Sequence, residues 1–512
     1  MRKPDNCIIV IFGASGDLTS RKLIPALFQL FRQDRMPADF AIVGIGTRDY
    51  TDDVFRGKML TALEPCLKAA DVASTHQLTR FLTHLHFHRM DQTLPESYPL
   101  LKSRLAEIDS IRGAGGKCVY YLATSPSQFG VIGGHLGHAQ MNSERDGQGW
   151  KRIVIEKPFG YDLASARTLN SQLREIFHEN QIYRIDHDLG KETVQNILAF
   201  RFANGMFEPL WNRNYVHHVE VTAAESIGIE DRGGYYDGAG ALRDMVQNHL
   251  LQVLATIAME PPSRFEANAV RDEKAKVFQS LAPILTGDVH QQVVRGQYLS
   301  SQIRGDEVAG YRQEKNVNVG SKTETFVALR FQIDNWRWGG VPFYIRTGKR
   351  LPTRVSEAVI HFKRSPQMLF SGGDQSRGVV NQLILRIQPD EGILLKFGMK
   401  LPGEGFEIKT VDMDFHYSDL ANAGLPEAYE RLLLDCMLGD ATLYARADAV
   451  EACWTFLTPI LDAWASDPRC RLHGYPAGTW GPKEAMSLFN EQGEDWRYPC
   501  KNLSNDGQYC EL

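Results

Sequence analysis

An apolar strand that runs straight into a glycine turn is the feature that most constrains the fold of this sequence. The run Cys7–Phe12 is followed directly by GASGDL at 13–18, and then by a segment whose apolar side chains recur at helical spacing. Glycines allow a tight turn, and the N-terminus of the next helix presents unpaired N–H groups to a pyrophosphate. We therefore expect a dinucleotide-binding loop. The motif lacks the full GxGxxG, so a plain strand–turn–helix corner remains the alternative.

The rest of the chain falls into two patterns. Up to residue 187, the apolar runs Phe40–Ile45, Val119–Ala123 and Ile153–Ile155 alternate with amphipathic stretches, as buried parallel strands and helices do. From about residue 190, half-polar strands with few long helices between the later ones favour a largely antiparallel sheet. We expect such strands at His217–Glu225, Glu324–Ile333, Val355–Phe362 and Val379–Ile387.

The predicted fold is thus an α/β Rossmann dinucleotide-binding domain over 1–187, followed by a β+α domain with a large, mainly antiparallel sheet over 188–512. The glycine-rich segments at 113–116, 130–149 and 228–240 are expected as loops.

Composition limits the partners. The chain has 57 basic and 62 acidic residues, so it lacks the basic excess that a nucleic acid would require. No apolar run approaches the roughly 20 residues that cross a bilayer, which argues against a membrane segment. Eight cysteines without a CxxC pair fit no zinc spacing, so we predict free thiols, no metal and a cytoplasmic location.

The residues after the second strand bear on the cofactor. The chain reads Gly46-Thr47-Arg48-Asp49. A carboxylate at this place binds the ribose hydroxyl of NAD, whereas an arginine accommodates the 2′-phosphate of NADP. Arg48 favours NADP, with a solvated loop charge as the alternative.

Two polar segments follow strands of the first domain. Lys157, in Glu156-Lys157-Pro158, comes at the carboxyl end of a parallel strand. A side chain at this place points toward the ligand crevice of the sheet, and the alternative is an ordinary lysine exposed to solvent. In RIDHDLGK (184–191), Asp186 and His187 would point to opposite sides if Ile185–His187 is extended. His187 and Lys191, the latter at a helix start, form a candidate phosphate clamp. A histidine with a structural role is the alternative for His187.

Two more candidates lie in the second domain. Along His217–Glu225, one face carries Val219, Val221, Ala223 and Glu225, and the other carries His218, Glu220 and Thr222. Glu225 would accept hydrogen bonds from sugar hydroxyls or form a salt bridge. A helix is expected over Ala241–Met259, and His249 falls on its apolar stripe. It is either a histidine packed in the core or a general base that is shielded from water. Asp244 lies about 140° away from it at α-helical spacing, so Asp186 is the candidate carboxylate for His249.

Five segments in this order resemble the glucose-6-phosphate dehydrogenase family: GASGDLTSRKL (13–23), IEKPFG (155–160), RIDHDLGKE (184–192), GGYYDGAGALRDMVQNHLLQ (233–252) and VPFYIRTGKRL (341–351). The resemblance extends to the TWGP segment at 479–482. It implies a homodimer or homotetramer that oxidises β-D-glucose 6-phosphate to 6-phosphoglucono-δ-lactone with NADP⁺, at the entry of the pentose phosphate pathway.

The resemblance also implies roles for single residues. His249 is similar to the base that takes the proton of the C1 hydroxyl, and Asp186 to the carboxylate that orients it. The other matches are His187 and Lys191 on the substrate phosphate; Lys157, Glu225, Asp244 and Lys349 on the sugar, with Lys22 and Arg354 as further cations; and Gly13, Ala14, Ser15, Gly16, Asp17, Leu18, Thr19, Ser20, Arg48, Asp91, Tyr121 and Lys157 on the cofactor.

Two departures stand out. The family pattern has tyrosine where this chain has Asp188, which must turn away from the phosphate or be paired. The arginine that selects NADP usually falls one residue earlier, at Thr47. Other Rossmann sugar oxidoreductases with a Glu-Lys-Pro motif, and a non-catalytic sugar-phosphate sensor, are the alternatives. The pairing of Asp186 and His187 with Lys191 argues against the former, and the presence of both His249 and Asp186 against the latter.

Overall fold

The computed structural model describes residues 2–66, 72–145, 147–365, 380–403, 406–420, 426–489 and 494–499. Val379, the first residue of one expected strand, lies outside these ranges. The chain divides into two compact units. The first comprises residues 1–191, 262–272 and 426–451, and the second comprises 192–261, 273–425 and 452–512. The domain boundary expected after residue 187 stays a prediction.

A six-stranded parallel sheet with the order β3-β2-β1-β4-β5-β6 forms the centre of the first unit. Its strands are β1 (Cys7–Phe12), β2 (Phe40–Gly46), β3 (Leu85–Arg89), β4 (Cys118–Leu122), β5 (Lys151–Ile155) and β6 (Ile182–Arg184). Every residue of β1, β2 and β4 is buried, as the continuous apolar runs predict. The strand order reverses between β1 and β4, as in a Rossmann fold, so this part of the fold prediction is confirmed.

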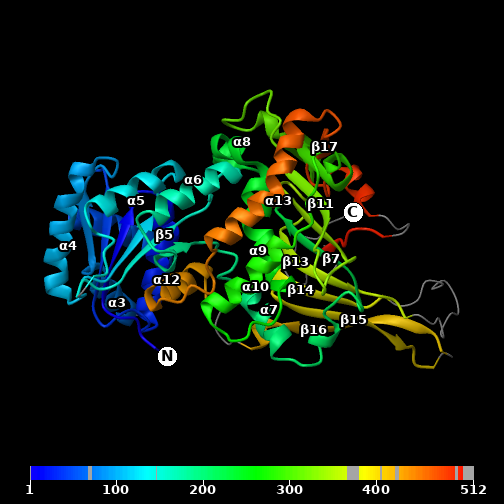
Figure 1. Ribbon diagram of the computed structural model, residues 1–512, viewed down its shortest axis with the longest axis horizontal. Coiled ribbons are helices and arrows are strands. Elements are labelled where there is room, and N and C mark those ends of the chain that lie inside the picture. Colours follow the sequence, from blue (N-terminus) through cyan, green and yellow to red (C-terminus); the bar gives the residue numbers. More distant parts are fainter. Residues whose placement is uncertain are drawn as a thin grey trace. The chain divides into compact units, whose positions relative to one another are not determined.

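Helices flank this sheet (Figure 1). They are the π-helix η1 (Thr19–Leu23), α1 (Ile24–Arg32), α2 (Asp52–Leu63), α3 (Val72–Leu82), α4 (Tyr98–Arg112), α5 (Phe129–His138), α6 (Leu163–Arg174) and α12 (Ala428–Leu438), with short 3₁₀ turns at Glu64–Cys66, Pro95–Ser97, Pro126–Gln128 and Glu179–Gln181.

The prediction of a loop over 130–149 is wrong for its first half, because α5 occupies Phe129–His138. Its glycines allow close contact with α6 and the residues after it. A Cβ on Gly133 would lie 3.0 Å from a methyl carbon of Leu173, and one on Gly137 would lie 2.6 Å from Ile176 Cγ2. The glycines here permit helix packing and do not mark a loop. By contrast, 113–116 is a turn with positive φ at Gly113.

A nine-stranded sheet dominates the second unit, in the order β16-β15-β14-β13-β7-β12-β11-β8-β17. All neighbours are antiparallel except β7 with β12 and β8 with β17, so a mainly antiparallel sheet is confirmed. The strands are β7 (Val216–Ala224), β8 (Val293–Leu299), β11 (Phe326–Gln332), β12 (Pro342–Gly348), β13 (Val355–Phe362), β14 (Gln382–Gln388), β15 (Gly392–Lys400), β16 (Ile408–His416) and β17 (Leu472–Pro476), and β9 (Ser301–Ile303) pairs with β10 (Asp306–Val308).

The helices of the second unit include α7, which packs against α9 and β14. They are α7 (Glu192–Phe202), α8 (Gly233–Ala241), the π-helix η8 (Leu242–Leu250), α9 (Leu251–Ala258) and α11 (Val289–Gln292), with 3₁₀ turns at Glu208–Leu210, Glu230–Arg232, Tyr311–Gln313, Tyr417–Asp419 and Lys483–Leu488. Two of the boundaries between the units, after residues 272 and 451, fall inside α10 (Ala267–Gln279) and α13 (Ala447–Ser466). None of the helices in the described ranges is both long and apolar enough to span a bilayer.

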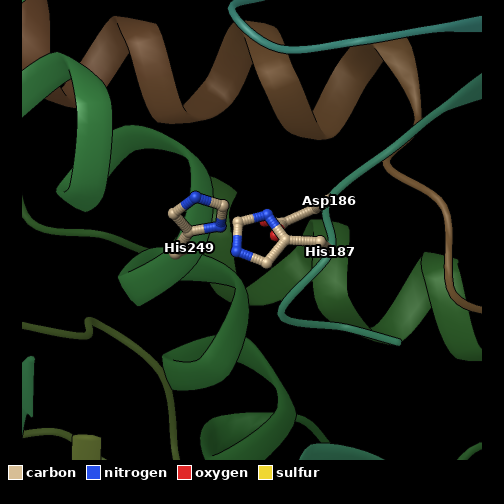
Figure 2. Close-up of side chains that lie close together, drawn as sticks. All are labelled: Asp186, His187 and His249. Carbon is tan, nitrogen blue, oxygen red and sulfur yellow. The ribbon is translucent and has the colours of Figure 1, made fainter. Parts of the chain in front are cut away.

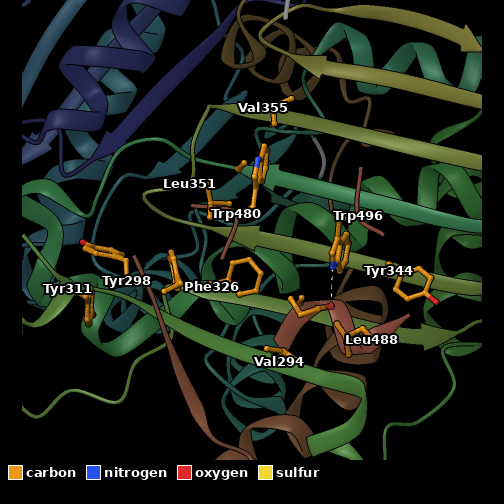
Figure 3. Close-up of a cluster of buried hydrophobic side chains, with 14 of the residues drawn as sticks. Val294, Tyr298, Tyr311, Phe326, Tyr344, Leu351, Val355, Trp480, Leu488 and Trp496 are labelled. Atoms are coloured by element: carbon orange, nitrogen blue, oxygen red, sulfur yellow. Dashed lines mark hydrogen bonds between the residues drawn. The ribbon is translucent and has the colours of Figure 1, made fainter. Parts of the chain in front are cut away.

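The strand predicted as half-polar, β7, is buried on both faces. One reason is the segment near the C-terminus, where Trp496 joins an aromatic cluster with Tyr344 and Trp480 (Figure 3). The indole N–H of Trp496 donates to the backbone oxygen of Ala485 over 3.1 Å, so its polar atom is satisfied inside the core. Tertiary packing therefore covers a face that the alternation in β7 leaves polar.

Candidate active site

The glycine turn after β1 has the geometry of an anion-binding loop. Gly13 has φ +80°, and a Cβ there would lie 2.3 Å from the backbone oxygen of Ala123, so glycine is required. After the turn, the N–H of Ser20 donates to the oxygen of Gly16 in an i→i+4 bond, so the N–H groups just before it belong to a helix start. Ser15, Gly16 and Asp17 are exposed, Gly13, Leu18 and Ser20 are half-buried, and Ala14 and Thr19 are buried. This turn fits the pyrophosphate of a dinucleotide.

Arginines lie at the ends of two neighbouring strands beside this loop. Arg48 is exposed two residues after β2, and Arg89 is the last residue of β3, paired in register with Gly46. Arg89 Nη1 lies 3.0 Å from Oδ1 of Asp49, the carboxylate that made the cofactor position ambiguous. The sequence alone did not single out Arg89, because strand β3 alternates histidine with apolar residues and lacks a continuous apolar run.

Glu156 and Lys157 directly follow the strand β5, and the Lys157–Pro158 peptide is cis. Glu156 accepts hydrogen bonds from the hydroxyl groups of Tyr121 (2.5 Å) and Tyr429 (3.2 Å). Burial raises the pKa of Glu156, and burial together with Glu156 raises the pKa of Tyr121 well above its usual value. Tyr121 is buried, with its hydroxyl held by Glu156, while Lys157 is half-buried at the carboxyl end of the sheet.

The segment after β6 forms turns, so the extended backbone assumed for Ile185–His187 is wrong beyond residue 186. The N–H groups of Leu189, Gly190 and Lys191 donate to the oxygens of Asp186, His187 and Asp188, respectively. These turns place the carboxylate of Asp188 at 2.5 Å from Lys191 Nζ and 3.6 Å from His187 Nε2. The expectation that Asp188 is paired is confirmed, and its partners are the two residues of the candidate phosphate clamp. Asp186 is buried and accepts the N–H of Asp188.

The remaining candidates of the first unit lie at the surface. Lys22 Nζ is 3.0 Å from Glu427 Oε2, in a pair whose side chains are about half exposed. Asp91 follows β3 and accepts the N–H and the hydroxyl of Thr93, which lower its pKa. Both residues therefore have local partners.

Three candidates of the second unit meet at one edge of its sheet. Glu225 follows β7, Lys349 follows the parallel neighbour β12, and Arg354 precedes β13, whose Val355 pairs with Ala224. Lys349 Nζ lies 2.6 Å from Glu225 Oε2, and this lysine is buried, whereas Arg354 is exposed. The register of three strands thus assembles a carboxylate and two cations from distant parts of the sequence.

Asp244 and His249 lie on η8, where the hydrogen bonds are of the π type. The single α-helix expected over Ala241–Met259 is therefore wrong, and so is the angle of 140° between these two residues, because residues five apart share one side of a π-helix. Both are buried, and His249 is only 1% exposed. Asp244 Oδ1 accepts the hydroxyl of Tyr235 at 3.4 Å; burial and this carboxylate raise the pKa of Tyr235 to about 12.

Glu324 fixes the start of η8. Its Oε1 accepts the N–H of Leu242 at 3.0 Å, and its backbone oxygen accepts the N–H of Ala241 at 3.0 Å. Gly240 has φ +73°, and a Cβ there would lie 2.4 Å from Glu324 Oε1. Burial raises the pKa of Glu324 despite the N–H of Leu242. The loop prediction for 228–240 is wrong over α8, and only Gly240 needs a glycine conformation there.

Figure 2 draws three of these side chains, Asp186 and His187 from the turn after β6 and His249 from η8. The glycine turn, the parallel sheet and the reversal of strand order define the first unit as a dinucleotide-binding domain of an oxidoreductase type.

Comparison with known proteins agrees with this class. The family profile "Glucose-6-phosphate dehydrogenase, NAD binding domain" matches residues 10–196, and "Glucose-6-phosphate dehydrogenase, C-terminal domain" matches 198–497. The glucose-6-phosphate 1-dehydrogenase of Aggregatibacter actinomycetemcomitans is 53% identical over 497 residues, which are 97% of this chain and 98% of that protein. The enzyme of the same name from Treponema pallidum (strain Nichols) is 49% identical over 509 residues, 99% of this chain and 98% of that protein.

The structures agree as well. A glucose-6-phosphate dehydrogenase in complex with its substrate glucose 6-phosphate superposes with a TM-score of 0.87 at 34% identity, over 97% of this chain and 100% of that one. The chain belongs to the glucose-6-phosphate dehydrogenase family.

Proposed function

We propose that this chain oxidises β-D-glucose 6-phosphate to 6-phosphoglucono-δ-lactone, the first step of the pentose phosphate pathway, with NADP⁺ as the hydride acceptor. The chain is a glucose-6-phosphate dehydrogenase, an oxidoreductase with a nicotinamide dinucleotide-binding domain. The observation that carries the proposal is the agreement with this family along both units, including every motif that holds a candidate site residue.

His249 is our candidate for the base that accepts the proton of the C1 hydroxyl. It is buried on a helix whose start is held by Glu324, so its position is defined by the fold rather than by a loop. A histidine shielded from water suits a general base near neutral pH. The carboxylate assigned to it from the sequence, Asp186, stays a prediction.

The remaining roles divide between two groups of residues. We propose that His187 and Lys191 bind the substrate phosphate, since an imidazole and an ammonium group, both hydrogen-bond donors, lie on consecutive turns. Glu225 and Lys349, with Asp244, Lys157, Arg354 and Lys22, are proposed to contact the sugar. The ion pair of Glu225 with Lys349 supports this, because it leaves a carboxylate and an ammonium oriented at a strand end, where sugar hydroxyls can donate and accept.

The test is NADPH formation from glucose 6-phosphate. We expect His249→Asn to lose at least about 10² in kcat, the contribution of a general base. His290→Asn, on α11 of the same unit, is the matched control and should keep full activity. Absence of NADPH formation by the unaltered chain would contradict the function. Near-full activity of His249→Asn would contradict the role of His249 alone.

The preference for NADP over NAD rests on Arg48 and Arg89. Arg89 pairs with the carboxylate of Asp49, which is therefore less available to a ribose hydroxyl, and both arginines can contact a 2′-phosphate. A charge-assisted hydrogen bond is worth about 1.5–3 kcal/mol, so each alanine variant should reduce the NADP:NAD ratio of kcat/KM by at least about tenfold. An unchanged ratio in both Arg48→Ala and Arg89→Ala would refute the assignment.

We also propose that the chain assembles as a homodimer or homotetramer, as its family resemblance implies. Light scattering on the eluting peak of a sizing column measures the assembly directly, and a mass near the 57.7 kDa of one chain would contradict it.

A further inference from the structure

Strand register brings two histidines and a glutamate together inside the second unit. His218 and Glu220 lie two residues apart on β7 and share a face. β13 pairs with β7 in antiparallel register, which sets His361 directly opposite His218. The two imidazole rings are stacked, with centroids 3.9 Å apart and planes 20° from parallel.

The carboxylate of Glu220 joins both rings. Its Oε1 lies 2.7 Å from His361 Nε2 and 3.4 Å from His218 Nε2. The three side chains are buried, with exposed fractions of 5% for His218, 1% for Glu220 and 7% for His361. One ligand atom from each lies within 4.8 Å of the other two. Two imidazole nitrogens and one carboxylate oxygen are a donor set that zinc uses when a fourth position is left to water.

The outer ring atoms of the cluster also have polar neighbours. His361 Nδ1 lies 3.2 Å from the amide of Gln382, and His218 Nδ1 lies 2.8 Å from His217 Nδ1 and 3.8 Å from Glu494 Oε1. Such contacts orient the imidazole ligands of metal ions in proteins and select which nitrogen faces the ion. The other carboxylate oxygen, Glu220 Oε2, accepts the backbone N–H of Arg497 at 3.1 Å.

Aromatic side chains form part of the surrounding shell, with Tyr344 and Phe489 ring centroids 5.6 and 6.1 Å from that of His218.

The cluster lies next to a cavity. His217 and Glu494, which contact His218, also line a cavity of about 500 Å³ in the second unit. Their own donor atoms, together with one from His218, lie within 4.8 Å of one another, so a second group of possible ligands lies between the cavity lining and the cluster.

We propose that His218, Glu220 and His361 bind a divalent transition-metal ion of the zinc type, with the fourth position open to water. The ion would link β7 to β13, and none of the three residues has a part in the proposed reaction. The metal prediction from the sequence considered cysteine spacing only. It could not find this cluster, because His361 is brought to β7 by sheet register.

The experiment uses the full chain after removal of bound metal with a chelator. Zn²⁺ is added in competition with a chromophoric chelator, and Co²⁺ serves as an optical probe of the coordination. We expect one equivalent of Zn²⁺ to bind with micromolar or tighter affinity, and the Co²⁺ protein to show ligand-field bands. Glu220→Gln and His361→Gln should each weaken binding by at least about tenfold. His416→Gln, which removes a half-buried histidine beside Asp390 and Asp414, is the matched control and should bind as the unaltered chain does.

Oxidation of glucose 6-phosphate reports whether each variant folds. X-ray absorption of the Zn²⁺-loaded, unaltered chain gives a second answer that needs no variant: nitrogen and oxygen ligands are expected. Absence of stoichiometric binding would show that the cluster is a hydrogen-bonded network only and would overturn the proposal. Thiolate ligands, or binding that survives both substitutions in folded protein, would overturn it equally.

Discussion

Asp188 stands where the sequence resemblance implies a tyrosine, and replacing it tests how the substrate phosphate is held. Its carboxylate lies 2.5 Å from Lys191 Nζ and 3.6 Å from His187 Nε2. Because these are the two side chains that we propose for the phosphate, the carboxylate competes with the substrate for them. Asp188→Tyr should therefore lower the KM for glucose 6-phosphate and leave kcat nearly unchanged.

The magnitude follows from the burial of the pair. The side chains of Asp188 and Lys191 are 13% and 19% exposed, so water screens their charges only in part. Two like charges about 6 Å apart repel by about 0.7 kcal/mol in water and about 2.8 kcal/mol at an effective dielectric constant of about 20. We take about 1–2 kcal/mol for the repulsion that is removed, which corresponds to a decrease in KM of about 5–30-fold.

Steady-state kinetics at saturating NADP⁺ measure the KM, and inhibition by inorganic phosphate probes the same contact without the sugar. Asp188→Asn removes the charge at nearly constant shape and should act in the same direction. Asp188→Glu keeps the charge and should not lower the KM. An unchanged or higher KM in both Asp188→Tyr and Asp188→Asn would refute the reasoning, because the carboxylate would then be positioning the cations rather than competing for them.

Three further predictions concern stability. Glu324→Ala should lower the free energy of unfolding by about 1–3 kcal/mol, since a buried N–H at the start of η8 loses its acceptor, and Glu324→Gln should lose less in the same urea titration; equal losses would contradict the capping role. Burial raises the pKa of Asp435 from 3.8 to about 6, so the folded state favours the protonated acid and loses about 3 kcal/mol as the pH rises through this window. The melting temperatures of Asp435→Asn and of the unaltered chain should therefore be compared from pH 4 to 8. That of Asp435→Asn should rise relative to that of the unaltered chain as the pH increases, and a difference that stays constant would contradict the raised pKa of Asp435. Gly137→Val should cost about 1–3 kcal/mol through overpacking, whereas Gly134→Ala, with open space at its Cβ, should gain about 0.5–1 kcal/mol; thermal melts that rank them in reverse would contradict the packing of α5.

Much of the fold can be predicted from the sequence where the local pattern agrees with the tertiary environment. The buried runs of β1 and β2 have no polar residue that would allow another structure, and β1 ends at Phe12 as expected. The prediction fails where packing overrides pattern. The glycines of α5 suggest a loop, yet they allow that helix to approach its neighbour, and the polar face of β7 is buried beneath a segment near the C-terminus.

The candidate site shows the same division. The pairing of Asp188 could be foreseen, because a carboxylate among phosphate-binding cations needs a partner. The contribution of Glu324 to the position of His249 could not, because it depends on a contact between the segment before β11 and the start of η8. Arg89 gave no signal either, since its proximity to the loop comes from the pairing of β3 with β2.

The sequence by itself determined which chemistry can be proposed for this protein: it has a glycine turn after an apolar strand, and motifs with a candidate base, a candidate phosphate clamp and candidate sugar-binding charges. These signals are local, because a few consecutive residues suffice for each of them. Only the tertiary structure decided which polar side chains contact one another. Lys349 meets Glu225, Arg89 meets Asp49, and His361 meets Glu220, each because two strands lie in one particular register. Register depends on the packing of whole sheets, and no short stretch of sequence contains it.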